Sequence, residues 1–86
     1  MTRYYPAYLN IDDRLAVVIG GGTIAERKIE QLLASGARVT LVSPEATPEV
    51  ERLASSDAIR WIKRAYSPGD LAGAWIAIAA TDNPEI

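Results

Sequence analysis

The 86-residue sequence contains no cysteine and no histidine. The lack of cysteine excludes disulfide bonds, thiolate metal ligands and cysteine nucleophiles, and a cytoplasmic protein is then the simplest expectation. The lack of histidine removes the commonest general base and metal ligand. Any chemistry must therefore depend on carboxylates, hydroxyls, backbone groups or a bound cofactor, and we predict no metal site.

Long hydrophobic runs and clustered positive charge are also missing. No apolar run approaches the roughly 20 residues that a membrane span needs, and we find no secretory signal. Nine basic and eleven acidic residues give a formal net charge of −2, with no basic cluster to hold a nucleic-acid backbone. Hydrophobic residues make up 49% of the chain, which suits a globular core. We therefore expect one domain over residues 1–86 that binds neither membrane nor nucleic acid.

The most informative stretch runs from Leu15 to Ser35. It begins with five apolar residues, Leu15–Ile19, of which three are β-branched, as in a parallel strand buried on both faces. Three glycines follow, and apolar residues then recur at helical spacing as far as Leu33. A glycine at position 36 is typical of the residue just past a helix end. The pattern predicts a strand, a glycine turn and a helix.

The glycine turn matches the dinucleotide-binding motif G-x-G-x-x-G/A at Gly20, Gly22 and Ala25. The first glycine permits a tight turn, the second lacks the side chain that would block a pyrophosphate, and the alanine lets the helix pack closely on the strand. Free N–H groups and the helix dipole favour negative charge at this helix N-terminus. Arg27 and Lys28 are near enough to be considered as further phosphate ligands. A turn without a ligand is the alternative, but the flanking strand and helix favour nucleotide binding.

A second strand is predicted over Arg38–Ser43, and its C-terminal end bears on the choice of cofactor. In NAD-binding folds this position commonly carries an acid that accepts the ribose hydroxyls, whereas here Ser43 and Pro44 occupy it and Glu45 follows. No Arg or Lys stands there to favour a 2′-phosphate. We therefore expect NAD rather than NADP, with the Ser43 hydroxyl or Glu45 in place of the usual acid. Glu45 could equally be a solvated loop residue.

A second helix and a third strand are predicted in the middle of the chain. Thr47 is expected to cap a helix that ends near Ser55. The third strand, over Ile59–Tyr66, is expected near a sheet edge, because its alternation of apolar and polar residues is imperfect. We expect Trp61 and Tyr66 to belong to the core.

The run Ala74–Ala80 predicts a fourth strand, buried on both faces, after a turn at Ser67–Leu71. Alternating strands and helices predict an α/β protein with a Rossmann-type parallel sheet of order 3-2-1-4 and helices on both faces. Ligands bind where the first and fourth strands of such a sheet meet, which brings Ala80, Thr81 and Asp82 opposite the glycine turn. Thr81 and Asp82 could instead cap a helix. The fourth strand has no later strand to pair with, so we expect a sheet that is incomplete at its C-terminal side and part of a longer enzyme.

With these residues placed, the chain resembles the N-terminal NAD-binding domain of the siroheme synthase family of precorrin-2 dehydrogenases and sirohydrochlorin ferrochelatases. The resemblance is nearly continuous from Tyr5 to Glu85. Triple glycine followed by Ala-x-Arg-Lys, paired with a late Ala-Ala-Thr-Asp, is more specific than the glycines alone. The matching segments are Tyr5-Pro6, Val17–Gly22, Ala25–Lys28, Leu32-Leu33, Gly36–Thr40, Ser43-Pro44 and Ala79–Asp82.

The resemblance implies oxidation of precorrin-2 to sirohydrochlorin with NAD as hydride acceptor in siroheme biosynthesis, followed in some members by insertion of ferrous iron. It also implies cofactor contacts at Thr23 and Ile24, at Pro44 and Glu45, and near Thr81. The family's catalytic aspartate comes after the next strand. We therefore name no catalytic residue and expect the 86-residue chain alone to be inactive, with a homodimer acting on the tetrapyrrole in the full-length enzyme.

The predicted cofactor site combines the motif, the strand ends and the resemblance. Its residues are Gly20, Gly21, Gly22, Thr23, Ile24, Ser43, Pro44, Glu45, Ala80, Thr81 and Asp82. A non-catalytic, NAD-sensing regulatory module is the competing interpretation, although such modules usually carry an acid where this chain has Ser43. A structural fragment without a ligand is a third.

Overall fold

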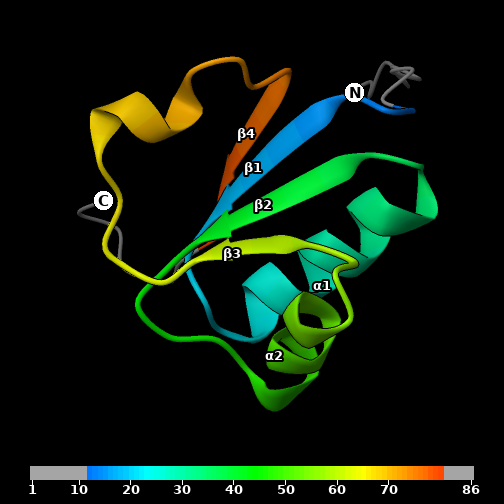
Figure 1. Cartoon of the computed structure of the whole chain (residues 1–86), viewed down its shortest axis with the longest axis vertical. Helices are drawn as coiled ribbons and strands as arrows, with labels where there is room; N and C mark the ends of the chain where they lie inside the picture. The colour runs from blue at the N-terminus through cyan, green and yellow to red at the C-terminus, as the bar shows by residue number, and fades with distance from the viewer. Residues whose placement is uncertain (1–11, 81–86) are drawn as a thin grey trace, which may run out of the picture.

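The computed structural model describes residues 12–80, which form a four-stranded parallel sheet with two α-helices and one 3-10 helix (Figure 1). Thr81 and Asp82 lie outside the described residues. The strands are β1 (Leu15–Ile19), β2 (Arg38–Val42), β3 (Arg60–Ile62) and β4 (Ile76–Ala79). The helices are α1 (Thr23–Ala34), α2 (Pro48–Ser55) and the 3-10 helix η1 (Pro68–Leu71).

The strand order is β3-β2-β1-β4 with every pair parallel, which confirms the predicted Rossmann-type order. Ile19 at the end of β1 is level with Val42 of β2 and with Ala79 of β4. Two hydrogen bonds continue the pairing past the strand ends: Gly20 N–H donates to the Val42 carbonyl at 3.2 Å, and Ala80 N–H to the Ile19 carbonyl at 2.8 Å. The carboxyl ends of three strands therefore meet at one edge of the sheet.

Both α-helices lie on the same face of the sheet, as Figure 1 shows, whereas helices were predicted on both faces. Right-handed crossovers from β1 to β2 to β3 run in one direction and place α1 and α2 together. The connection from β3 to β4 runs back past the other face and carries only η1, a helix of four residues.

No helix within residues 12–80 is both long and apolar enough to cross a bilayer. The core cluster between sheet and helices comprises Ala16, Val18, Ala25, Ile29, Leu32, Ala37, Val39, Leu41, Val50, Ile59 and Ala80.

The prediction that the last strand is buried on both faces is wrong. Ile76 and Ile78 pack against the core cluster, but Ala77 and Ala79 are exposed. Trp75, just before the strand, is 55% exposed. The Arg14 guanidinium carbon lies 4.6 Å from the centre of the Trp75 ring. Alternating alanine and isoleucine make both faces of this strand apolar. The sequence pattern therefore could not show that α1 and α2 cover only one of the two faces.

The third strand is shorter than predicted and ends at Ile62. It pairs only with β2, and the Arg64 N–H donates to the Ile62 carbonyl at 2.9 Å, which turns the chain away from the sheet. Trp61 is half-buried and packs against the core as predicted, but Tyr66 is 39% exposed, so its assignment to the core was wrong.

An ion pair stabilises the connection between β3 and β4. The Arg64 guanidinium donates two hydrogen bonds to the Asp70 carboxylate, one of them 2.8 Å long, and the Ser67 N–H donates a third at 2.7 Å. The hydrogen bond from Arg64, followed by the one from Ser67, lowers the pKa of Asp70 below its ordinary value of 3.8. Because the folded pKa is lower than the unfolded one, this group stabilises the fold at pH values above 3.8 and loses that effect as the pH falls through the folded pKa.

Replacement of Asp70 by asparagine is therefore expected to destabilise the chain in a pH-dependent way. The difference in unfolding free energy between wild type and Asp70→Asn should be largest near about pH 6 and should shrink near about pH 3, where the carboxylate becomes protonated in the unfolded chain. Urea denaturation at both pH values measures it. The same difference in unfolding free energy at both pH values would contradict the assigned role of the Asp70 carboxylate.

The turn between β1 and α1 packs directly on the connection between β2 and α2. Gly20 has a φ of +113°, which only glycine adopts readily. A β-carbon at Gly21 would lie 1.7 Å from the carbonyl oxygen of Glu45 and 2.6 Å from the Ser43 hydroxyl oxygen. A β-carbon at Gly22 would meet no atom within 4 Å. The middle glycine is thus required by contact with the protein itself, whereas Gly22 faces open space.

This difference predicts unequal losses of stability for two neighbouring alanine substitutions. Gly21→Ala should lower the unfolding free energy by about 1–3 kcal/mol, because backbone atoms must move to admit the methyl group. Gly22→Ala should cost less, about 0.5–1 kcal/mol, since the site is open and alanine is only a poorer N-cap than glycine. Urea denaturation of both variants compares them, and equal losses would show that the close approach at Gly21 is not needed.

Candidate functional site

A cavity of about 360 Å³ lies where the carboxyl ends of β1, β2 and β4 meet. This volume is in the usual range for small-molecule sites. Three segments form the cavity, namely the glycine turn with the start of α1, the connection after β2, and the residue after β4. Its lining residues are Gly21, Gly22, Thr23, Ile24, Ser43, Pro44, Glu45 and Ala80.

All eight lining residues belong to the cofactor site predicted from the sequence. Gly20 shapes the turn but does not line the cavity, and neither Arg27 nor Lys28 lines it. Thr81 and Asp82 cannot be placed because they lie outside residues 12–80. Parallel topology explains why segments more than 50 residues apart in the chain come together here, because every parallel strand ends at the same edge.

The N-terminus of α1 is suited to an anion. Its N-cap is Gly22, so no side chain caps the helix, and the first backbone bond runs from Glu26 N–H to the Gly22 carbonyl at 3.0 Å. The N–H groups of residues 23–25 therefore precede the first helical hydrogen bond, next to the cavity that Thr23 and Ile24 line. Such N–H groups and the helix dipole together bind phosphate. The open space at Gly22 leaves room for it.

Ser43 forms the opposite wall and is held by three hydrogen bonds. It is 5% exposed; its N–H donates to the Ile62 carbonyl at 3.2 Å, and its carbonyl accepts from the Trp61 indole N–H at 2.9 Å. Its hydroxyl oxygen accepts the Glu45 N–H at 3.3 Å. The hydroxyl proton is still available to donate to a ligand. The contact from Trp61 was missed, because the sequence pattern identified this residue only as core.

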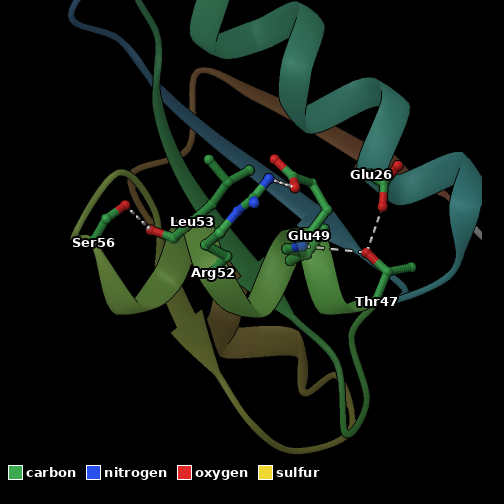
Figure 2. A network of polar contacts seen from close by, with 7 residues as sticks. Glu26, Thr47, Glu49, Arg52, Leu53 and Ser56 are labelled. Atoms are coloured by element: carbon green, nitrogen blue, oxygen red, sulfur yellow. Dashed lines mark hydrogen bonds and ion pairs between the residues drawn. The ribbon is translucent and has the colours of Figure 1, made fainter.

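Thr47 caps α2 as predicted and also links this helix to α1. Its hydroxyl oxygen accepts the Val50 N–H at 3.2 Å, and the hydroxyl donates to Glu26 Oε1 at 2.6 Å. Figure 2 shows Glu26 reaching from the first turn of α1 to Thr47 at the start of α2. No role was predicted for Glu26 from the sequence. No local pattern indicates this contact, because the two residues are 21 positions apart.

Among the residues between 12 and 80 that line the cavity, Glu45 is the one that carries a charge, and none is a lysine or an arginine. Within the described part of the chain, no group of three or more acidic side chains is placed to hold a metal ion. The polar groups offered to a ligand are therefore backbone N–H groups, hydroxyls and one carboxylate. This set matches the phosphates and ribose hydroxyls of a dinucleotide.

Comparisons with known proteins agree with this geometry. Siroheme synthase 1 of Aeromonas salmonicida (strain A449) is 42% identical over 83 residues, which are 96% of this chain and 18% of that protein. Precorrin-2 dehydrogenase of Bacillus subtilis (strain 168) is 37% identical over 81 residues, which are 94% of this chain and 50% of that protein. The solved structure of SirC, precorrin-2 dehydrogenase, matches with a TM-score of 0.87 and 29% identity, over 95% of this chain and 41% of that one.

The chain thus spans between 18% and 50% of the length of these relatives. A family model described as "Putative NAD(P)-binding" matches residues 7–86, nearly the whole sequence. The match includes the glycine turn, the connection after β2 and the end of β4, which are the three segments around the cavity. The chain therefore belongs to this family of NAD(P)-binding domains.

Proposed function

We propose that this chain is the NAD-binding domain of a precorrin-2 dehydrogenase that forms sirohydrochlorin in siroheme biosynthesis. The observation that carries the proposal is the cavity between the uncapped N-terminus of α1 and the wall at Ser43, in a chain whose relatives include precorrin-2 dehydrogenase. When bound, NAD would supply the hydride acceptor for this oxidation. The tetrapyrrole, dimerisation and any ferrochelatase activity belong in this proposal to the longer cytoplasmic enzyme of which the domain is one part.

Each part of the cavity has a counterpart in the dinucleotide. The N–H groups at the start of α1 would bind the pyrophosphate, and the adenosine ribose would lie at the end of β2 against Ser43 and Glu45. Ile24 lines the cavity yet is 50% exposed, so a bound ligand would cover apolar surface there. In this proposal these residues bind and orient the cofactor, and none of them is assigned a catalytic role.

The charge of the cavity predicts a preference for NAD over NADP. A 2′-phosphate needs a partner of opposite charge, whereas the lining residues that the structure describes carry no positive charge and include the Glu45 carboxylate. Isothermal titration should show NAD binding about tenfold more tightly or better. Glu45→Arg, as a matched variant, should reduce this preference, and a wild-type preference for NADP would overturn the electrostatic argument.

The assignment of the pyrophosphate predicts that Gly22→Asp abolishes NAD binding in a folded chain. The new carboxylate would enter the open space beside the helix N-terminus and repel the phosphates. Gly69→Asp is the matched control, because a β-carbon there also meets no atom within 4 Å, and this glycine does not line the cavity. Titration with NAD, together with NADH formation from precorrin-2 by the full-length enzyme, measures the effect. Unchanged binding by folded Gly22→Asp would refute the proposed site.

A further inference from the structure

We propose that Glu26 and Trp61, which do not line the cavity, are positioning residues that hold its wall at residues 43–47 in the shape that binds the dinucleotide. This inference depends on the proposed function, since it concerns the same cavity. Residues 43–47 connect β2 to α2, and three of them line the cavity. The two positioning residues hold opposite ends of this connection, from β3 and from α1.

Trp61 holds the first end. Its indole N–H donates to the Ser43 carbonyl at 2.9 Å, and its half-buried ring packs against the core cluster. An indole N–H is only a donor, so this bond fixes which way the carbonyl points. The N–H and hydroxyl oxygen of Ser43 have partners as well. Ser43 therefore cannot rotate without breaking a hydrogen bond, and loss of the Trp61 donor would leave a carbonyl unpaired in a residue that is only 5% exposed.

Glu26 holds the second end. The Thr47 hydroxyl already accepts the Val50 N–H, so its single proton is directed to Glu26 Oε1 at 2.6 Å, a short, charge-assisted hydrogen bond (Figure 2). Glu26 is half-buried in the first turn of α1, beside the N–H groups assigned to the pyrophosphate. This bond thus joins the helix that would bind the phosphates to the connection that would bind the ribose.

The middle of the connection contacts the glycine turn by packing, while the Glu45 N–H bonds within the connection to the Ser43 hydroxyl oxygen. The Glu45 carbonyl lies against Gly21, where no β-carbon fits, and this contact includes no hydrogen bond between the two residues. The width of the cavity between the glycine turn and this wall therefore depends on the two hydrogen-bonded ends. A wall that is rigid before the ligand arrives lowers the cost of ordering on binding. Loosening either end should weaken NAD binding while every lining residue is retained.

Glu26→Ala and Glu26→Gln separate this role from a simple effect of charge. Alanine removes the acceptor but favours the helix, so the variant should fold. Glutamine retains an oxygen that accepts from Thr47 and removes the charge. We expect Glu26→Ala to raise the Kd for NAD about threefold to tenfold, the effect of one lost hydrogen bond, and Glu26→Gln to stay close to wild type. Glu30→Ala is the control, because this exposed carboxylate lies one turn further along α1.

Trp61→Phe tests the other end, since phenylalanine retains an aromatic ring and lacks the N–H donor. It should raise the Kd for NAD by a similar factor. Melting temperatures of all variants show that each is folded during the titration. The inference is overturned if Glu26→Ala and Trp61→Phe bind NAD as wild type does, or if Glu26→Gln is as weak as Glu26→Ala. A wild-type chain that does not bind NAD refutes the proposed function instead.

Discussion

The structure depends on the close approach of two backbone segments, the glycine turn after β1 and the connection after β2. The absence of a side chain at Gly21 permits this approach, because a β-carbon there would overlap the Glu45 carbonyl. The contact brings the start of α1 next to Ser43 and closes the cavity on one side. The parallel strands bring the two segments to the same edge, and the missing β-carbon at Gly21 lets them pack in direct contact.

The cavity has two parts, the polar groups that face a ligand and the residues that hold these groups in place. Its ligand-facing groups are backbone N–H groups, hydroxyls and one carboxylate, which suit the phosphates and ribose hydroxyls of a cofactor. The frame around it consists of parallel strand ends and of side chains such as Trp61 and Glu26 that contact the wall from behind. This arrangement suits a domain that binds and orients NAD.

Local chemistry made some elements predictable from the sequence. Leu15–Ile19 is a strand as predicted, because a continuous β-branched run ends at glycines, and Thr47 caps α2 because a proline and acids follow it. The composition of the cavity wall followed from parallel topology, which brings the ends of β1, β2 and β4 together. The exposed face of β4 was not predictable, since the cover on a strand depends on the path of the crossover. The contacts of Glu26 and Trp61 were not predictable either, because each depends on how distant elements pack.

In the proposed complex, the dinucleotide binds between the start of α1 and the wall after β2. The most direct test is titration of the chain, labelled with 15N, with NAD while the backbone amide resonances are followed by NMR. The largest amide shifts are expected at residues 21–24, 43 and 45, with little change in η1; residue 44 is a proline and has no amide N–H. Shifts concentrated elsewhere in the fold, or no shifts at saturating NAD, would contradict the proposed complex.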